Sequence, residues 1–348
     1  MVEWIKLGDI CEIKTGRGIT QKDCTEKGLY PVISGGQTPM GMYNQYNREA
    51  HNITISRVGA NAGYVSYIWQ RFYLNDKCFS IIPFNDTIFN KRYLYIILKN
   101  KEDGIRKLQS EGGVPTINTQ KLSSLIIPVP SVSEQNNIVD KLDSFTSSID
   151  NLKQQIAQRR KQYEYYREQI INSSDTMTKN LYLGDIAIVK TGTKPAEILD
   201  VGIYKYINAG TTESGFVNSY NCDGDVVTTP SRGQGGIGFV GYQSSPFWLG
   251  PLCYQIRPNN KILVCKYLFY YLSSHNDKIM KLKSEGGTPA VNRQDLIKIK
   301  IPVPSLSEQQ RIVDILDKFE ASIQNLEAQL SQREKQYEYY RNKLLTFE

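Results

Sequence analysis

The sequence lacks the features that mark several common classes of protein. It has only two histidines, His51 and His275, in unrelated contexts, which argues against a histidine-based catalytic triad or a multi-histidine metal site. Its six cysteines form no CxxC pair, which argues against a zinc module and favours reduced thiols. No apolar run is long enough to span a bilayer, and the N-terminal residues do not resemble a signal peptide. We therefore expect a cytoplasmic protein with no membrane partner.

The sequence also lacks a convincing catalytic motif. Residues 233–238 match GxGxxG, but the run FVGYQ that follows looks like a strand, whereas the dinucleotide fingerprint must open a helix. We interpret this stretch as a glycine-rich loop. No Asn-Pro-Pro-aromatic or Asp-Pro-Pro-aromatic tetrad is present, so the chain carries no amino-methyltransferase site of its own. We expect no catalytic residue, no metal ligand and no cofactor in this chain.

Length and charge predict two separate domains on a neutral scaffold. A chain of 348 residues with 40% hydrophobic residues suits two or three folded domains. Its net charge of +7 divides into +5 over residues 1–130, 0 over 131–174, +4 over 175–304 and −2 over 305–348. This distribution favours two polyanion-binding domains, although ordinary fluctuation would also account for it.

Two stretches carry apolar residues at heptad spacing, which predicts two long helices in a coiled coil. In residues 131–171 the seam consists of Ile138, Leu142, Phe145, Ile149, Leu152, Ile156, Tyr163, Tyr166 and Ile170. In the second stretch it consists of Ile312, Leu316, Phe319, Ile323, Leu326, Leu330, Tyr337, Tyr340 and Leu344. A single arginine, Arg159 or Arg333, interrupts each seam. Ser131 and Glu134 form a plausible capping box at the start of the first helix.

The chain is an internal duplication. Residues 108–171 align without a gap to residues 282–345, with 37 of 64 positions identical. Leu-Gly-Asp-Ile and Lys-Thr-Gly recur near the start of each block, and SEGG, IPVPS and QYEYYR recur at its end. The predicted organisation is a first domain over 1–130, a helix and linker over 131–174, a second domain over 175–304 and a second helix over 305–348.

Between the repeated flanks, residues 17–107 and 193–281 diverge. Both are rich in Gly, Tyr, Asn, Thr and short β-type runs, which predicts small mixed α/β domains with twisted, mostly antiparallel sheets. Only faint similarities remain, such as Ser56-Arg57 against Ser231-Arg232. Repeated flanking segments around divergent central segments favour two versions of one recognition domain, each reading something different. The fold class is therefore α+β, a pseudo-two-fold tandem repeat.

The short linker after residue 171 favours an antiparallel helix pair. A domain of about 125 residues has a radius of gyration near 14 Å, whereas a helix of about 40 residues is roughly 60 Å long. In a parallel pair the second domain would have to reach back along the whole helix. An antiparallel arrangement also separates Arg159 from Arg333 in the seam.

The loops of both domains combine bare glycine backbone with side chains that suit nucleic acid. Arginine, asparagine and glutamine bind base edges, and exposed N–H groups approach phosphates. The same residue types also populate ordinary tight turns, and that interpretation stays open for each residue. The candidate DNA-binding residues are Lys14, Arg17, Gly36, Gln37, Thr38, Arg57, Asn61, Gly113, Thr116, Asn118, Lys190, Asn208, Thr211, Thr212, Ser231, Arg232, Gln234, Thr288 and Asn292.

The repeated QYEYYR segment predicts a partner surface on the helices. Tyr163 and Tyr166 lie on the seam, whereas Tyr165 and its counterpart Tyr339 lie off it and should be exposed. Arg167 and Arg341 follow two residues later, and we assign these four residues, Tyr165, Arg167, Tyr339 and Arg341, to partner binding.

With these features together, the chain resembles the specificity (S) subunit of type I restriction-modification systems. The resemblance is carried by Leu-Gly-Asp-Ile, by Pro-x-Pro-Ser-x-Ser-Glu-Gln at each helix entry, by the heptads and by the tandem organisation, and it covers essentially the whole chain. It implies two target-recognition domains that each read half of a split double-stranded DNA site. It implies helices that space them and dock two methyltransferase (M) subunits, which bind S-adenosylmethionine, with restriction (R) subunits joining for cleavage.

Two other interpretations remain open from the sequence. One is a non-enzymatic coiled-coil scaffold whose paired heads bind proteins or glycans, and the other is an enzyme. Steeply salt-dependent binding to duplex DNA would favour the specificity subunit over the scaffold. Turnover by the purified chain without added partners would favour an enzyme.

Overall fold

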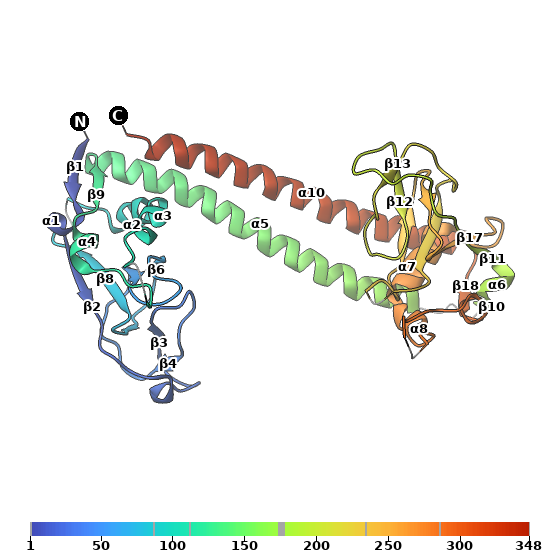
Figure 1. Ribbon diagram of the computed structural model, residues 1–348, viewed down its shortest axis with the longest axis horizontal. Coiled ribbons are helices and arrows are strands. Elements are labelled where there is room, and N and C mark those ends of the chain that lie inside the picture. The colour runs from blue at the N-terminus through green and yellow to red at the C-terminus, as the bar shows by residue number, and fades with distance from the viewer. Residues whose placement is uncertain are drawn as a thin grey trace. The chain divides into compact units, whose positions relative to one another are not determined.

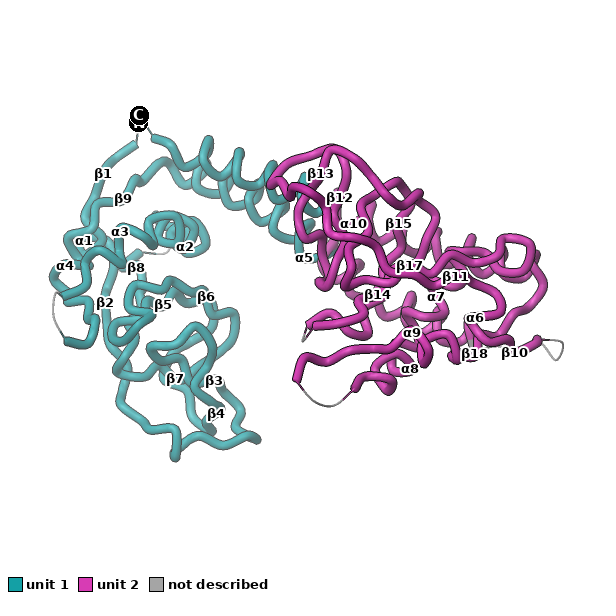
Figure 2. Tube along the Cα trace, turned by 45° about the vertical axis from the view of Figure 1, so that its right-hand side comes forward, with its two compact units in different colours: residues 1–151, 330–348 teal, residues 152–329 magenta. Residues whose placement is uncertain are grey.

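The computed structural model describes residues 2–85, 88–110, 113–172, 178–233, 235–284 and 287–347. It divides into two compact units, drawn in teal and magenta in Figure 2. Unit 1 contains Met1–Asn151 and Leu330–Glu348, and unit 2 contains Leu152–Gln329. Each unit therefore combines one mixed α/β head with part of each long helix. We refer to residues 3–129 as head 1 and to residues 179–303 as head 2.

The two predicted long helices are present as α5 (Val132–Asn172) and α10 (Leu306–Leu345), which lie side by side in each unit (Figure 1). Both begin directly after the serine of an IPVPS segment, and Ser131 Oγ accepts a hydrogen bond from the Glu134 N–H at 3.3 Å. The seam residues buried as expected include Ile138, Leu142, Ile149, Leu152, Ile156, Ile312 and Leu316.

Contacts within each unit show that the helices run antiparallel, as predicted. In unit 1, Phe145 of α5 stacks on Tyr340 of α10 with ring centroids 5.2 Å apart. In unit 2 the equivalent pair has exchanged helices, because Tyr166 of α5 stacks on Phe319 of α10 at 5.6 Å.

The seam arginines are separated, also as expected, and each lies over an aromatic ring of the opposite helix. The Arg333 guanidinium is 5.6 Å from the Phe145 centroid, and that of Arg159 is 5.9 Å from the Phe319 centroid. Stacking on a ring lets a guanidinium occupy a largely apolar seam.

Head 1 contains three small sheets. They are a four-stranded antiparallel sheet in the order β2-β8-β5-β6, a three-stranded sheet β4-β3-β7 with one parallel pair, and the antiparallel pair β1-β9. The strands are β1 (Glu3–Lys6), β2 (Cys11–Thr15), β3 (Tyr30–Ile33), β4 (Met42–Tyr43), β5 (Asn52–Ser56), β6 (Val65–Ile68), β7 (Tyr73–Leu74), β8 (Cys78–Pro83) and β9 (Ile126–Val129). The helices are α1 (Leu7–Ile10), the 3-10 turn η1 (Gln21–Asp23), α2 (Lys91–Asn100), α3 (Glu102–Arg106) and α4 (Thr119–Ser123).

Head 2 repeats this topology, with sheets β11-β17-β14-β15, β13-β12-β16 and β10-β18. Its strands are β10 (Lys179–Tyr182), β11 (Ala187–Thr191), β12 (Tyr204–Ile207), β13 (Phe216–Val217), β14 (Val226–Pro230), β15 (Gly241–Gln243), β16 (Trp248–Leu249), β17 (Cys253–Pro258) and β18 (Lys300–Val303). Its helices are α6 (Leu183–Ile186), α7 (Cys265–Ser274), α8 (Asn276–Met280) and α9 (Arg293–Leu296). The predicted α+β class, with mostly antiparallel sheets, is confirmed.

The Leu-Gly-Asp-Ile motif forms a single helical turn in each head. The sequence suggests one extended piece from residue 4 to 15, but α1 divides it into β1 and β2, which join different sheets. Leu7 is fully buried, and its N–H donates to the Leu125 carbonyl at 2.8 Å. At Gly8 an added Cβ would lie 2.7 Å from the Cβ of Ser123. Tertiary packing against the segment around α4 therefore overrides the local β pattern.

Each long helix is joined to its head by a buried glutamine of the Ser-Glu-Gln motif. Gln135 is fully buried, accepts from the Asn90 N–H at 2.9 Å and donates to the Pro130 carbonyl at 2.9 Å. Gln309 does the same with the Val264 N–H and the Pro304 carbonyl, at 2.8 and 2.9 Å. Because the oxygen and the NH₂ group of each buried glutamine side chain both have hydrogen-bond partners, each glutamine orients its helix entry relative to its head.

Each head core is completed by the end of the other helix. Leu344, Leu345 and Phe347 of the C-terminal segment pack against the head 1 core. In head 2, Ile171 at the end of α5 is a buried core member. The described residues contain no helix long and apolar enough to cross a membrane. All six cysteines are free thiols.

Candidate nucleic-acid interface

Three loops of head 1 meet, and they carry several of the predicted DNA-binding residues. These loops follow β3, follow β5 and precede α4. The first two are joined by Gln37, whose Nε2 donates to Asn61 Oδ1 at 3.2 Å. The last two are joined by an antiparallel bridge between Val58 and Thr116. The structure thus brings together side chains that are up to 79 residues apart in the sequence, from Gln37 to Thr116.

The loop after β3 presents Gly36, Gln37 and Thr38 to solvent. These residues form the rim of a cavity of about 120 Å³, whose wall includes the hydroxyl side chains of Ser56 and Ser66. A shallow cavity with amide and hydroxyl groups at its rim can offer both donors and acceptors to base edges or to phosphate.

Three other candidates in head 1 are Gly113 and Asn118, which lie in the loop that precedes α4, and Arg17, which lies just after β2. Asn118 is the N-cap of α4 and accepts from the Gln120 N–H at 2.7 Å, so capping accounts for it locally. Gly113 adopts φ +75° in an exposed turn, a backbone conformation that favours glycine. Arg17 is exposed just after β2, and its N–H donates to the Leu74 carbonyl at 3.1 Å.

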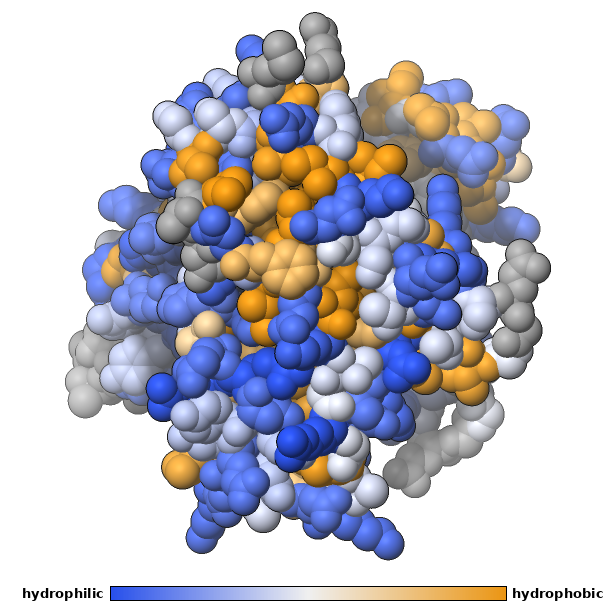
Figure 3. Space-filling model, turned by 90° about the vertical axis from the view of Figure 1, so that its left-hand side faces the viewer, coloured by the Kyte–Doolittle hydropathy of each residue, from blue (hydrophilic) through white to orange (hydrophobic). Residues whose placement is uncertain are grey.

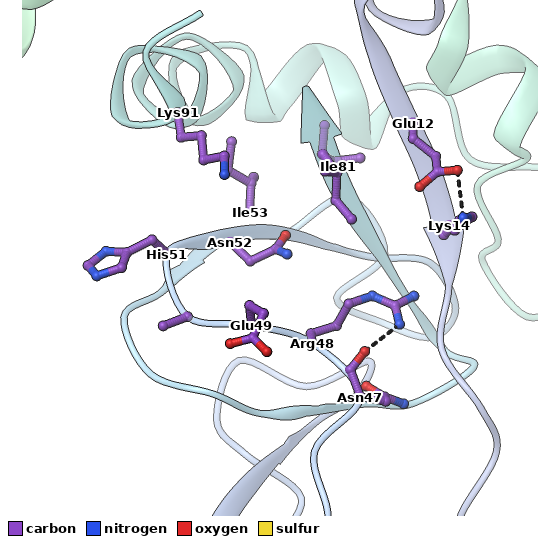
Figure 4. Close-up of a pocket in the computed structure, with 12 residues that line it drawn as sticks. Glu12, Lys14, Asn47, Arg48, Glu49, His51, Asn52, Ile53, Ile81 and Lys91 are labelled. Atoms are coloured by element: carbon purple, nitrogen blue, oxygen red, sulfur yellow. Dashed lines mark hydrogen bonds and ion pairs between the residues drawn. The ribbon is translucent and has the colours of Figure 1, made fainter. Parts of the chain in front are cut away.

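Lys14 lines a separate cavity of about 360 Å³ on the four-stranded sheet (Figure 4). It pairs with Glu12 at 2.6 Å. Beside it, Arg48 donates to the Thr15 carbonyl at 3.0 Å and to Ser80 Oγ at 2.8 Å. Burial lowers the pKa of Arg48, with the charge of Glu12 acting in the opposite direction. Because Arg48 is fastened to the sheet, this cavity is a rigid, mixed-charge pocket.

Head 2 assembles the corresponding loops in a different way. Arg232 forms an antiparallel bridge with Ala290, and the Gly233 N–H donates to the Pro289 carbonyl at 3.0 Å. Where head 1 has the Gln37–Asn61 hydrogen bond, head 2 has a close backbone approach. A Cβ added at Gly236 would lie 2.0 Å from the Ala209 carbonyl oxygen, so no larger residue fits there without a backbone shift.

Thr211 and Thr212 line a cavity of about 600 Å³ in head 2. Phe239 and Lys266 also line it, which gives it an aromatic and a cationic side. Asn208 has a structural task, because its Oδ1 accepts from the Leu252 N–H at 2.9 Å.

The remaining head 2 candidates are distributed over the surface and the loops. Lys190 and Thr288 are exposed, Ser231 is 8% exposed, and Asn292 occupies the N-cap position of α9. Gln234 lies outside the described residues.

The isolated β-bridges correct one pairing of equivalent residues that the sequence suggests between the two heads. The sequence similarity pairs Ser56-Arg57 with Ser231-Arg232. In the structure Val58 pairs with Thr116, and Arg232 pairs with Ala290, which is the aligned counterpart of Thr116. Arg232 is therefore equivalent to Val58, and Arg57 to Ser231. The turn after the bridge is one residue longer in head 2, and this insertion produced the misleading alignment.

The register shift puts the two arginines on opposite sides of equivalent extended segments, since successive side chains alternate there. Arg57 is half-buried; its guanidinium donates to the Asp76 carbonyl at 3.4 Å and lies 5.8 Å from the Phe79 centroid. Arg232 is exposed. Of the two, Arg232 is the one free to reach a ligand, whereas Arg57 is largely occupied with packing.

Sequence reasoning missed a cluster that fastens head 1 to α5. Arg92 forms a bidentate pair with Asp143 at 2.8 to 3.0 Å. Its guanidinium lies 4.8 to 5.2 Å from the rings of Tyr67, Trp69 and Tyr95. Burial lowers the pKa of Arg92, but the hydrogen bonds to Asp143 and the charge interactions with Asp143, Tyr95 and Tyr67 together outweigh it, so the pKa is raised. No local signal reveals this cluster, because Arg92 and Asp143 are 51 residues apart.

The corresponding cluster of head 2 keeps the aspartate, as Asp317, but has Lys266 in place of Arg92. Lys266 pairs with Asp317 of α10 at 2.6 Å, and Tyr270 donates to the same carboxylate at 2.6 Å. Burial and this hydrogen bond raise the pKa of Tyr270.

Within the described ranges, no group of three or more His, Cys, Asp and Glu side chains is placed to hold a metal ion. Burial raises the pKa of the thiols of Cys11, Cys78, Cys253 and Cys265 to about 12. These thiols are therefore protonated at neutral pH, which makes them poor nucleophiles and poor metal ligands.

On the long helices, Tyr165 and Tyr339 are each 61% exposed, as expected from their positions off the seam. Each forms an edge-to-face pair with the next tyrosine, at 5.4 and 5.3 Å. Arg167 instead lies over the ring of Tyr163 at 5.4 Å. The exposed feature of each helix is thus a pair of adjacent tyrosines, with the arginine packed toward the seam.

Comparison with known proteins gives a family over most of the chain. Residues 1–159 and 177–334 each match the model of the type I restriction modification DNA specificity domain. The chain is 26% identical to the type I restriction enzyme EcoR124I/EcoR124II specificity subunit of Escherichia coli, over 99% of this chain and 94% of that protein.

Solved structures share the fold. The crystal structure of a type I restriction-modification system S subunit from M. genitalium aligns with a TM-score of 0.74 at 21% identity, over 100% of this chain and 97% of that chain. The HsdS subunit from Thermoanaerobacter tengcongensis aligns with a TM-score of 0.51 at 16% identity, over 99% and 96%.

Proposed function

This chain belongs to the family of type I restriction modification DNA specificity domains, and from that premise we propose how it works. Each head reads one half of a bipartite, asymmetric double-stranded DNA target in the cytoplasm. The observation that carries this proposal is that the two heads have the same framework but differ in the contacts that join their loops. The two heads share sheet order and helix entry, yet their loops meet through different side chains. Two different reading surfaces would select two different base sequences.

The chemistry of the loops supports DNA as the ligand. Exposed Gln37, Thr38 and Arg232 belong to residue types whose side chains commonly bind base edges in the major groove. The net charges of +5 and +4 on residues 1–130 and 175–304 favour a polyanion.

The test is to co-express the chain with its methyltransferase subunit and to sequence the methylated DNA. We expect a split target with two unlike halves. A single continuous palindrome would contradict the two-head proposal. A matched control omits this chain and should show no methylation of that target.

We further propose that α5 and α10 dock two methyltransferase subunits, which bind S-adenosylmethionine and perform the methyl transfer, with restriction subunits joining for cleavage. The chain itself is then non-catalytic and holds no cofactor. Support comes from the exposed pairs Tyr165–Tyr166 and Tyr339–Tyr340, which repeat on the two helices and are of a type common at interface centres.

The double variant Tyr165→Ala with Tyr339→Ala tests the docking proposal. In sedimentation of the mixed complex, we expect the two-to-one species to dissociate while the variant chain alone keeps its helicity. The control, Glu164→Ala with Glu338→Ala, alters exposed neighbours on the same turns and should leave the complex intact. An unchanged complex in the tyrosine variant would exclude these rings from the interface. Methyl transfer by the isolated chain would contradict its non-catalytic role.

A further inference from the structure

Head 2 carries a groove of about 360 Å³ at one edge, between α8, α9 and the start of β18. Its seven lining residues are Lys278, Lys281, Leu282, Asp295, Lys298, Ile299 and Lys300, and we call this the lysine groove. Four ammonium groups around one hollow repel each other unless anions balance them. The lining supplies a single carboxylate, so the groove is built for an external anion.

The carboxylates near the groove hold its lysines only weakly. Lys281 pairs with Asp277 at 2.6 Å and Lys298 with Asp295 at 3.3 Å, but the two lysine side chains are 75% and 70% exposed. Exposed pairs of this kind contribute little and exchange readily. Four lysines against two carboxylates leave an excess of two positive charges.

The other two lysines are oriented by aromatic side chains. Lys278 donates to the Tyr271 hydroxyl, and Lys300 lies 5.4 Å from the centroid of the Tyr182 ring. An ammonium group has three donors, so each of these lysines retains N–H groups for a further acceptor.

Helix α8 links the lysine groove to the loop that presents Arg232. Helix α8, which supplies Lys278, packs against the glycine-rich turn after Arg232. A Cβ added at Gly238 in that turn would lie 2.5 Å from the sulfur of Met280. Helix α8 therefore lies between the groove, which it lines with Lys278 and Lys281, and the turn after Arg232, which it contacts through Met280.

Head 1 has the same fold here but places its charged side chains at different positions. The equivalents of the four groove lysines are Gly104, Lys107, Ser124 and Ile126, and the equivalent of Asp295 is Lys121, each 174 residues earlier. Ile126 pairs with Lys6 where Lys300 pairs with Tyr182, so the two occupy the same strand position. The side of the molecule that carries α4 and β9 shows apolar patches among hydrophilic ones (Figure 3), and Ile126 is 50% exposed. The fold does not require the lysines, which points to a binding role.

We propose that the lysine groove binds phosphates of the DNA backbone beside the bases that head 2 reads. This inference rests on the proposed function, because it takes duplex DNA as the ligand. A lysine is a point charge that suits a phosphate oxygen without selecting a base.

The experiment measures DNA affinity of the full chain as a function of salt. A variant with Lys278, Lys281, Lys298 and Lys300 each changed to Gln is compared with the unmodified chain by fluorescence anisotropy, using target and scrambled duplexes over a range of KCl concentrations. The slope of log K against log [KCl] should become shallower by about 0.9 for each phosphate that the variant no longer neutralises. The ratio of target to scrambled affinity should not change.

The control removes the same charge from the long helices by changing the exposed Lys141, Lys161, Lys318 and Lys335 to Gln. Its slope should match that of the unmodified chain. A reciprocal variant, Gly104→Lys with Ser124→Lys, adds two ammonium groups to head 1, and a Cβ at Gly104 meets open space. Its slope should become steeper.

The outcomes separate this inference from the proposed function. An unchanged slope in the groove variant, with target preference intact, would overturn the inference alone. Loss of target preference would also overturn it, because the lysines would then read bases. Unchanged DNA binding with loss of the methyltransferase subunit would identify an acidic protein surface as the ligand instead. If the unmodified chain showed no salt-dependent duplex binding, the proposed function would fail together with the inference.

Discussion

Head 1 and head 2 hold their loops together by different physical means. In head 1 a hydrogen bond between the Gln37 and Asn61 side chains spans the gap between two loops. In head 2 the backbone at Gly236 closes directly on the Ala209 carbonyl. The first arrangement tolerates changes of side chain but depends on matching polar groups, and the second has no polar requirement but admits only glycine. One fold can therefore support loop surfaces with unrelated sequences.

The helix entries and the tightly packed glycines of the two heads, in contrast, use the same residue types. A Cβ at Gly16 or at Gly192 would lie 1.9 or 1.8 Å from the carbonyl oxygen of Leu74 or Leu249. Gln135 and Gln309 make equivalent hydrogen bonds at the helix entries. The two repeats thus keep the residues that pack the framework, and they differ in the residues that join the loops.

The largest expected effect comes from exchanging the whole divergent segment of one head. Replacing residues 17–107 by the equivalent stretch of a related specificity subunit should change one half of the methylated target completely and leave the other half unaltered. The reason is that head 1 has its own core and its own loop network. Methylome sequencing after co-expression with the methyltransferase subunit measures the result. If both halves changed, the heads would not be independent.

The second prediction concerns the two kinds of loop junction. Gly236→Ala should destabilise head 2 by about 1–3 kcal/mol, because the new methyl group overlaps the Ala209 carbonyl and the backbone must move. Asn61→Ala should destabilise head 1 less, by about 0.5–1.5 kcal/mol, because it removes one partly exposed hydrogen bond.

Urea unfolding of the full chain, followed by hydrogen exchange of peptides from each head, assigns these losses of stability. Gly235→Ala is the matched control, because a Cβ at Gly235 meets no atom within 4 Å. Equal destabilisation at Gly235 and Gly236 would contradict the close backbone approach.

The third prediction separates the two arginines. Arg232→Ala should cost about 1–3 kcal/mol of discrimination at one base of the head 2 half-site, if its fork binds a base pair in the major groove. Arg57→Ala should leave discrimination nearly unchanged and should instead cost head 1 about 0.5–1 kcal/mol of stability, because the guanidinium no longer packs on the Phe79 ring. Competition binding with single-base variants of the target measures the first effect. A larger loss of discrimination for Arg57→Ala would reverse these roles.

The arginines also show how far the sequence determines the result. Heptad spacing and the ungapped repeat were sufficient for the two helices, their antiparallel packing and the tandem heads, because these depend on periodicity and chain length. The equivalence of Arg57 and Arg232 could not be predicted, since a one-residue insertion in the glycine-rich turn is invisible without the bridges to Thr116 and Ala290.

The anchoring residues were missed for a related reason. Arg48 and Arg92 are held by partners 32 to 51 residues away, and the sequence gives no local sign of such contacts. Asn118 shows the opposite case, because its capping position was the ordinary turn chemistry that the sequence left open. Sequence patterns thus located the loops but not the task of each side chain in them.

The smallest expected effect is a difference in acid sensitivity between the heads. Glu102 of head 1 accepts from the Val65 N–H at 3.0 Å and is paired with Lys99 and Arg106, with only 16% of its side chain exposed. The equivalent position in head 2 is Asn276, which does not titrate. Burial raises the pKa of Glu102, but the hydrogen bonds from Lys99, Val65 and Arg106 together outweigh it, so the pKa lies below its ordinary value of 4.5.

Because the pKa of Glu102 is lower in the folded than in the unfolded chain, its stabilisation is complete above about pH 4.5 and is lost as the pH falls through the folded value. We therefore expect peptides of head 1 to lose protection from hydrogen exchange in mild acid sooner than those of head 2. Glu102→Gln should lower the stability of head 1 at pH 7 and remove part of this pH dependence, whereas Glu197→Gln, at an exposed position of head 2, should do neither. If acid affected both heads equally in the unmodified chain, the Glu102 network would not be a source of their difference.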